Sequence, residues 1–148
     1  METKKEFILA LLKVQKELPI VPKNSEGDTG NRKYSYAKIE KVWETCGKII
    51  NDNGFVITNE ISKEGVKTTA HHEHGELSSF FSFTAEAIKP QKIGSETTYA
   101  RRYNLTAIFG IICAGEDDDG QEAMKATEKL STKKGNGVTE RNDAPILD

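Results

Sequence analysis

The chain has 148 residues, which is enough for one domain with a hydrophobic core and a short tail. Its 21 lysines and arginines nearly balance 23 aspartates and glutamates, so the net charge alone does not indicate a nucleic-acid-binding protein. No apolar run reaches the length of a membrane span, and the first residues lack the apolar core of a signal peptide. We therefore expect a soluble, cytoplasmic protein with no membrane partner.

Charge is distributed unevenly along the chain. Residues 1–110 carry 16 lysines and arginines against 14 acidic residues, whereas residues 111–148 carry 5 against 9. A mildly basic body with an acidic C-terminal region suits an anionic ligand on the body and a regulatory or partner-binding tail. Cys46 lies on an apolar helical stripe and Cys113 ends an apolar run. We expect both to be buried thiols in a reducing compartment, without a disulfide.

The first half of the chain predicts two helices separated by a loop. Residues 3–18 have apolar residues at helical spacing and end at Pro19, and residues 19–35 are rich in proline, glycine and turn formers. Residues 36–52 give the clearest helix, which Asn53-Gly54 ends with a left-handed stop. Its expected apolar face consists of Ile39, Val42, Trp43, Cys46, Ile49 and Ile50.

Three strands are predicted next, at residues 55–61, 66–72 and 77–88. Short turns at 63–65 and 73–76 favour an antiparallel meander. In the third strand, Leu77, Phe81, Phe83, Ala85 and Ala87 share one face, and Ser78, Ser82, Thr84 and Glu86 share the other. This alternation is typical of a sheet with one buried face.

A third long helix is expected to begin near Ser95, which would act as its N-cap after a break at Pro90. Its buried stripe would be Leu105, Ile108, Phe109 and Ile112, and the acidic run 116–119 with Gly120 would end it. A short helix over 121–130 and a disordered tail complete the prediction. The fold class is therefore α+β, with helices on one face of a small three-stranded antiparallel sheet (a β-β-β-α core). We expect a functional domain at 1–130 and a flexible acidic tail at 131–148.

All four tyrosines lie in two basic segments. Tyr34 and Tyr36 occur in NRKYSYAK, and Tyr99 and Tyr103 flank two adjacent arginines in TTYARRYN. Guanidinium groups and flat rings together suit a phosphate backbone with stackable bases. The alternative is structural, because tyrosines often pack at helix edges and adjacent arginines often lie on a solvated face. The candidate DNA-binding residues are Arg32, Lys33, Tyr34, Tyr36, Lys38, Lys92, Ser95, Thr97, Thr98, Tyr99, Arg101, Arg102 and Tyr103.

Helix geometry separates the two adjacent arginines. Arg101 and Arg102 lie roughly 100° apart around a helix, so they cannot both point the same way. One is expected to contact phosphate, and the other to pair with a carboxylate or a neighbouring subunit. Thr97, Thr98 and a helix start at Gly94-Ser95 could also donate to a phosphate.

The acidic run Glu116, Asp117, Asp118 and Asp119 is a weak candidate for a divalent metal site and hence for a metal-dependent nuclease. The favoured reading is a helix cap or an ion-pair partner, because no second acidic cluster lies near a histidine. Three histidines fall at a predicted hairpin: His71, His72 and His74. They lack the spacing of a structural zinc site, so we expect them to be solvated at the hairpin tip. No phosphate-binding glycine loop or nucleophile–base pair occurs. We expect no catalytic residue, no metal and no cofactor.

Three ordered segments resemble the Erf family of phage single-strand annealing proteins. They are KYSYAKIEKVW (33–43), GSETTYARRYNLTAIFGI (94–111) and EDDDG (116–120). The resemblance covers roughly residues 5–125, and it is the combination of segments that is specific. Glu96-Thr97 departs from the pattern, since small or apolar residues are more usual there, and Glu96 adds a negative charge near the proposed DNA surface.

The resemblance implies a recombination mediator that is not an enzyme. Such proteins coat single-stranded DNA and pair it with a complementary strand without ATP, as rings or helical filaments, and their relatives include the RecT and Red-beta types. The implied partners are single-stranded DNA, the annealed duplex and further copies of the chain. Apart from the resemblance, the ending DAPILD mixes acidic and apolar residues and could contact a host single-strand-binding protein, although a passive solubilising tail is favoured. Two alternatives stay open: a nuclease, and a non-catalytic oligomeric adaptor in which YARRY is a subunit interface.

Overall fold

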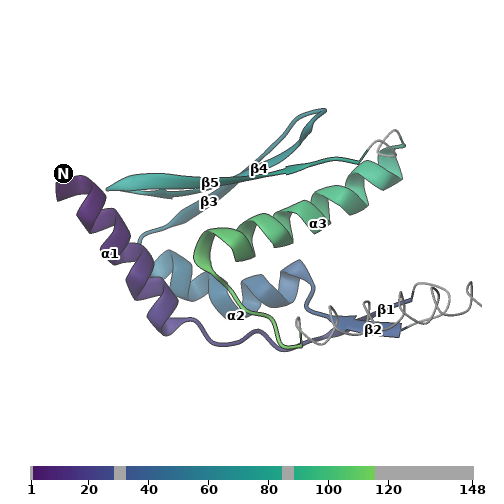
Figure 1. Cartoon of the computed structure of the whole chain (residues 1–148), viewed down its shortest axis with the longest axis horizontal. Coiled ribbons are helices and arrows are strands. Elements are labelled where there is room, and N and C mark those ends of the chain that lie inside the picture. Colours follow the sequence, from purple (N-terminus) through teal and green to yellow (C-terminus); the bar gives the residue numbers. More distant parts are fainter. Residues whose placement is uncertain (1, 29–32, 85–88, 116–148) are drawn as a thin grey trace, which may run out of the picture. The chain divides into compact units, whose positions relative to one another are not determined.

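The computed structural model describes residues 2–28, 33–84 and 89–115. Its elements are, in chain order, α1 (Glu2–Glu17), β1 (Ser25–Asp28), β2 (Lys33–Tyr36), α2 (Ile39–Asp52), β3 (Val56–Ile61), β4 (Gly65–His72), β5 (Gly75–Ser82) and α3 (Pro90–Phe109) (Figure 1). The predicted α+β fold with a three-stranded antiparallel sheet is confirmed. The helix expected at 121–130, the domain boundary after residue 130 and the tail lie outside the described residues.

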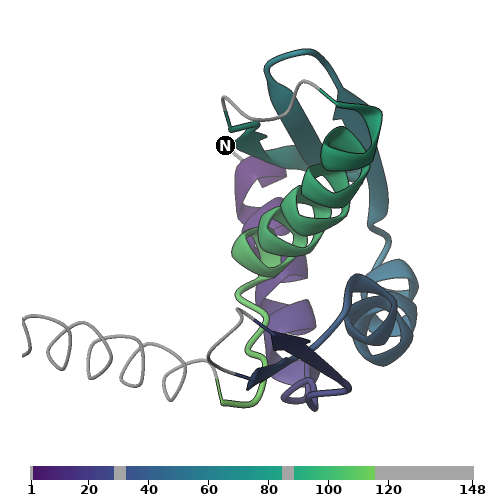
Figure 2. The ribbon, with the colours of Figure 1, turned by 90° about the vertical axis from the view of Figure 1, so that its right-hand side faces the viewer.

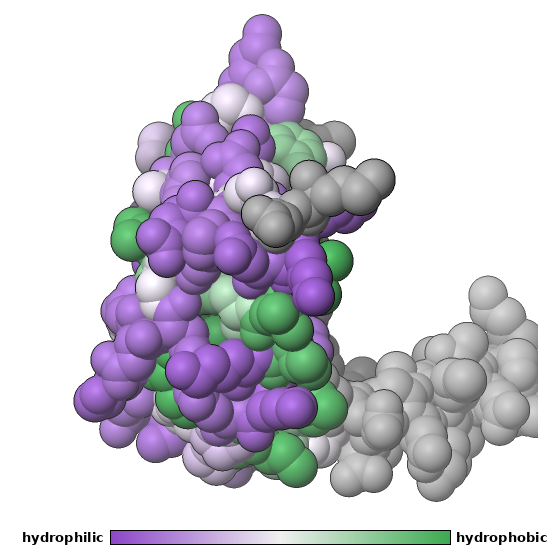
Figure 3. Space-filling model, turned by 90° about the vertical axis from the view of Figure 1, so that its left-hand side faces the viewer, coloured by the Kyte–Doolittle hydropathy of each residue, from purple (hydrophilic) through white to green (hydrophobic). Residues whose placement is uncertain are grey.

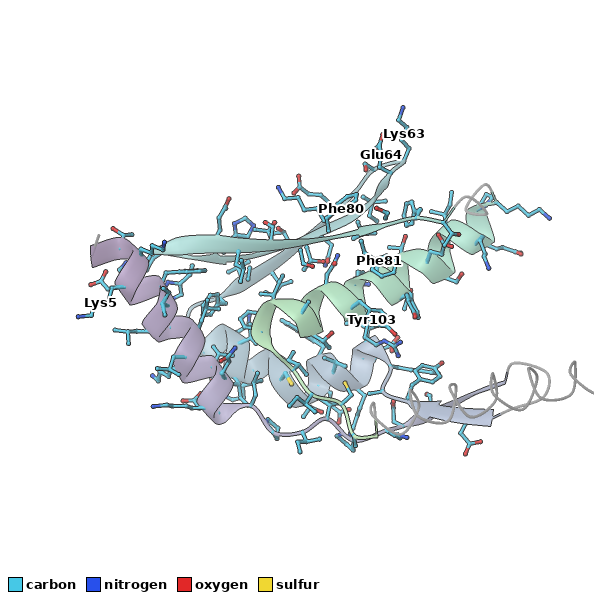
Figure 4. All side chains as sticks on the ribbon, in the orientation of Figure 1. Lys5, Lys63, Glu64, Phe80, Phe81 and Tyr103 are labelled. Carbon is cyan, nitrogen blue, oxygen red and sulfur yellow. The ribbon has the colours of Figure 1, made fainter. Side chains whose placement is uncertain are left out.

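The sheet is the predicted meander, in the order β3-β4-β5. Val66 of β4 pairs with Phe81 of β5, and the next residue pair, Lys67 and Phe80, faces the other way. Figure 4 shows Phe81 pointing toward α3 and Phe80 pointing away from it. The alternation expected for the third strand is therefore confirmed within β5.

All three helices lie on the same side of this sheet (Figures 1 and 2). α3 packs along β4 and β5, α1 contacts β5, and each helix contacts the other two. The opposite face of the sheet carries polar side chains, with hydrogen bonds of 2.8 Å between the hydroxyls of Thr69 and Ser78 and of 2.8 Å between Thr58 and His71, beside the exposed ring of Phe80. The fold thus has one layer of helices and one sheet face without a covering element among the described residues.

The core forms between the helices and the covered sheet face. Phe55, just before β3, packs edge-on against Phe109 of α3 and Phe7 of α1, with ring centroids 5.3 Å and 5.9 Å apart. Three residues of α2 are fully buried, as the apolar stripe predicts: Val42, Cys46 and Ile50. These contacts bring apolar residues from every layer into one cluster.

α2 ends where the sequence predicts. Gly54 has φ +84°, the left-handed conformation that glycine adopts without strain. The side-chain Nδ2 of Asn53 donates to the carbonyl of Ile49 at 2.8 Å and to the carboxylate of Glu17 in α1 at 2.9 Å. The C-terminal end of α2 is therefore also bound to the end of α1.

Both predicted ends of α3 are wrong. The helix begins at Pro90, whose fixed φ and missing N–H suit a first helical position, so Ser95 lies inside the helix and is not its N-cap. It ends at Phe109, because Gly110 adopts a left-handed φ of +66°. After the helix, Cys113 forms an isolated parallel β-bridge with Val21, and Ile112 is 60% exposed instead of buried.

The segment expected as a loop at 19–35 contains two short strands. β1 and β2 pair antiparallel, with Ser25 opposite Tyr36 and Asp28 opposite Lys33. Asn24 connects this hairpin to α2, because its side chain accepts a hydrogen bond of 2.9 Å from the backbone N–H of Lys38. The hairpin thus places Tyr36 directly before α2.

Both cysteines are buried and neither forms a disulfide, as expected. Burial raises the pKa of the Cys46 thiol above its ordinary value, since the protein interior disfavours a thiolate. In the described part of the chain, no helix combines the length and the apolarity needed to cross a lipid bilayer.

Candidate nucleic-acid interface

α3 carries the YARRY segment and directs its two arginines into different surroundings. Arg102 is half-buried and donates from Nη1 to the carbonyl of Ala37 at 3.0 Å. Its guanidinium carbon lies 5.1 Å from the ring centroids of Tyr36 and Tyr103 and 5.3 Å from that of Tyr99. These distances are within the range of cation–π attraction.

The tyrosines around Arg102 also bind one another. Tyr99 donates its hydroxyl proton to the hydroxyl of Tyr103 at 2.9 Å, and both rings pack against Phe81 of β5, with centroids 5.7 Å and 5.8 Å away. We call Tyr36, Phe81, Tyr99, Arg102 and Tyr103 the tyrosine–arginine cluster. It joins the end of β2 to α3 and the sheet, so Arg102 contributes to the fold. Tyr99 and Tyr103 still expose more than two-fifths of their surface.

Arg101 lies outside the tyrosine–arginine cluster and is exposed. It has no hydrogen bond, ion pair or ring contact with any residue in the described ranges. It lines a pocket of about 150 Å³ between α2, α3 and the strands β3 and β4. The residues of this tryptophan pocket are Ile39, Trp43, Ile57, Asn59, Thr68, Arg101 and Leu105.

Trp43 is the functional candidate that sequence reasoning missed. We expected it on the buried apolar face of its helix, but 39% of its surface is exposed. Its indole lies over Gly47, where an added Cβ would be only 2.7 Å from Cε2 of the ring. The sequence contained one sign of this arrangement. Gly47 follows Trp43 by four residues on a predicted helix, and positions four apart share a helix face.

Asn104 has a structural role that its sequence position did not reveal. It is 1% exposed, donates from Nδ2 to the carbonyl of Val66 at 3.0 Å and accepts from the hydroxyl of Ser79 at 3.0 Å. Both partners lie in the sheet. Asn104 therefore fixes α3 against β4 and β5, and so fixes the directions in which Arg101 and Arg102 point.

The hydroxyl groups predicted near the start of α3 bind their own helix. Thr97 donates to the carbonyl of Ile93 at 2.7 Å, Thr98 to Gly94 at 3.2 Å, and Ser95 to Lys92 at 3.0 Å. Because the helix begins at Pro90, Gly94-Ser95 is not a helix start, and the predicted phosphate site on its N-terminal N–H groups is wrong. The roles of these side chains in DNA binding stay predictions.

Glu96 has an identified partner. Its carboxylate accepts hydrogen bonds from both the backbone N–H and the hydroxyl of Thr84, with the N–H bond at 3.1 Å. The departure from the family pattern thus ties α3 to the chain that follows β5.

The remaining predicted residues are only partly placed. Lys38 and Lys92 are exposed, at the N-terminal ends of α2 and α3. Lys33 and Tyr34 belong to β2, whose register with β1 is described but whose side chains at these positions are not. Arg32 and the acidic run 116–119 lie outside the described residues. Within residues 2–28, 33–84 and 89–115, no three His, Cys, Asp or Glu side chains form a metal-binding group.

The histidines lie at the predicted β4–β5 hairpin, but they are bound rather than simply solvated. His71 is 3.2 Å from Glu76 and His74 is 3.1 Å from Glu6 of α1. The ring of His72 packs on Phe55, with centroids 4.7 Å apart. The hairpin therefore helps to attach α1 to the sheet.

α1 exposes large apolar side chains on its outer surface. Ile8 is 52% exposed, Leu9 51% and Leu12 42%. Figure 3 shows hydrophobic residues gathered among hydrophilic ones on the side of the molecule where α1 lies. Exposed apolar groups clustered in this way are typical of an interaction surface.

Comparison with known proteins gives one match. The model of the ERF superfamily matches residues 7–144. Neither the curated proteins nor the solved structures gave a match. The matched range contains every element from the middle of α1 to the end of α3, including the YARRY segment and Trp43. The chain therefore belongs to the ERF superfamily, the family of single-strand annealing proteins that its sequence resembles.

Proposed function

We propose that this protein binds single-stranded DNA and anneals complementary strands without ATP, in phage homologous recombination. The observation that carries the proposal is Arg101, an exposed guanidinium without a partner in the described ranges, beside the exposed indole of Trp43. A cation and an aromatic surface side by side are what a single strand requires, since every nucleotide offers a phosphate and a base.

Annealing does not require a bond-making residue. The protein must neutralise phosphates, extend the strand and leave base edges accessible to a second strand. Contacts to the backbone are independent of sequence and sensitive to salt. We propose Arg101 as the principal phosphate contact on α3, with Lys38 and Lys92 as further exposed cations and the exposed rings of Tyr99 and Tyr103 as stacking surfaces. Arg32, Lys33, Tyr34, Tyr36, Ser95, Thr97 and Thr98 remain candidates.

We further propose that the protein acts as a homo-oligomer. One subunit with few cationic contacts binds weakly, whereas repeated sites raise the effective concentration of the next contact. The exposed Ile8, Leu9 and Leu12 of α1 supply apolar surface for a second copy. The annealing domain would end near residue 130. Residues 131–148 would act as a solubilising tail in the cytoplasm, with a host single-strand-binding protein as its candidate partner.

An annealing assay tests this function against its alternatives. Labelled complementary strands are mixed with the protein in EDTA, without ATP, and again with Mg²⁺. We expect rapid duplex formation under both conditions, with strands of unchanged length. Strands shortened only with Mg²⁺ would support a nuclease instead. If Arg101→Ala dissolves oligomers while the monomer binds DNA normally, the arginine serves assembly, as in the adaptor hypothesis.

A further inference from the structure

The tryptophan pocket has the size and position of a site for one planar ring. Its volume of about 150 Å³ is well below the roughly 300–1,000 Å³ of pockets that hold drug-sized ligands. Trp43 forms one wall and is more than one-third exposed. Gly47 leaves room for the indole to lie across α2, since any Cβ there would push the ring away.

The lining combines apolar walls with polar groups in a way that suits a nucleobase. Asn59 accepts the hydroxyl proton of Thr68 through Oδ1 at 2.7 Å, so its amide nitrogen keeps two N–H donors for a ligand. Every natural base carries acceptor atoms on its edges, so such donors do not restrict the sequence. Arg101 is the only charged residue of the lining, which therefore favours an anionic ligand.

We propose that this pocket receives one unstacked base of the bound strand, with the base on the indole of Trp43, its edge on Asn59 and an adjacent phosphate on Arg101. The proposal rests on the proposed function, because it requires that the protein bind single-stranded DNA. A base in this pocket fixes the strand at one point per subunit. Neighbouring bases then stay accessible to the complementary strand.

Intrinsic fluorescence reports on this pocket directly, because Trp43 is the only tryptophan of the chain. The full-length protein is titrated with a labelled dT oligomer and with an abasic oligomer of equal length. Label anisotropy follows binding, and tryptophan emission follows the pocket. We expect both oligomers to bind, the dT oligomer about tenfold more tightly. Only the dT oligomer should quench the emission.

Two variants remove the proposed contact, and a third serves as control. Trp43→Ala should lose most of the preference for dT over the abasic oligomer. Gly47→Ala should do the same with the tryptophan still present, since the new Cβ displaces the indole while alanine favours the helix. Phe80→Ala removes an aromatic ring that is 53% exposed on the opposite face of the sheet, and it should keep the tenfold preference.

The outcomes distinguish a failure of the base pocket from a failure of the proposed DNA binding. If neither oligomer changes the anisotropy, the proposed DNA binding itself fails. If dT binds without quenching Trp43, or if Trp43→Ala keeps the preference while its circular dichroism is unchanged, the base pocket is wrong. A variant that keeps the preference but changes the oligomer size in light scattering would instead assign the pocket to a subunit contact.

Discussion

Arg101 and Arg102 are adjacent in sequence, yet they belong to two different regions. Arg102 lies within the tyrosine–arginine cluster, where three rings and a backbone carbonyl surround its guanidinium. Arg101 lies at the tryptophan pocket, exposed and without a partner in the described ranges. The same residue type therefore serves the fold on one side of α3 and is available to a ligand on the other.

Of the variants proposed here, Arg102→Ala should have the largest effect, which is a loss of folding stability. The change leaves the carbonyl of Ala37 without its donor and removes the cation from the tyrosine rings. We expect the free energy of unfolding to fall by about 2–3 kcal/mol, measured by urea denaturation. Arg102→Lys should lose much of this stability too, because an ammonium lacks the planar fork. Wild-type stability combined with lost DNA binding would place Arg102 on the DNA instead.

Arg101→Ala should weaken DNA binding and leave folding stability almost unchanged, which is the reverse of the result expected for Arg102→Ala. We expect affinity for single-stranded DNA to fall about tenfold, or ~1.4 kcal/mol, with the free energy of unfolding changed by less than about 0.5 kcal/mol. Fluorescence anisotropy of a labelled oligomer measures the first quantity and urea denaturation the second. The slope of log affinity against log salt should decrease by about 0.7, as one phosphate contact is lost.

A charge-matched control separates a specific contact of Arg101 with DNA from a general effect of positive charge. Lys63→Ala removes one positive charge from the tip of the β3–β4 hairpin, where Lys63 lies beside Glu64 (Figure 4). We expect almost no change in affinity from this variant. An equal loss in both variants would mean that DNA senses only the overall charge of the domain.

The smallest expected effect concerns Glu96. Because its carboxylate binds Thr84, Glu96→Gln should cost about 0.5–1 kcal/mol of stability and leave DNA affinity unchanged. Thermal denaturation and the same anisotropy titration test both parts. If the variant instead binds DNA several-fold more tightly at unchanged stability, Glu96 faces the DNA rather than the sheet.

The sequence predicted the fold well where local patterns dominate. The strand alternation in β5 placed Phe81 toward the helices, and the 100° step of a helix separated Arg101 from Arg102. The ends of α3 were wrong because proline is tolerated in a first turn and Gly110 ends the helix before the acidic run. The β1–β2 hairpin was missed because Ser25–Asp28 has no apolar alternation.

The candidate site was only half predictable, because its geometry depends on contacts between distant segments. Helical spacing placed Trp43 with Val42 and Cys46, but the position of β3 and the glycine at position 47 leave the indole partly exposed. Likewise, Arg102 binds a carbonyl 65 residues away in sequence. No local pattern could show which of the two arginines finds a partner within the chain.

Arginine modification tests the division between the two regions most directly. The wild-type protein is treated with phenylglyoxal, alone and bound to a dT oligomer, and each arginine is followed by mass spectrometry. We predict that Arg101 reacts in the free protein and is protected by DNA, whereas Arg102 reacts slowly in both states. Fast reaction of Arg102 that DNA suppresses, with Arg101 unaffected, would contradict the account.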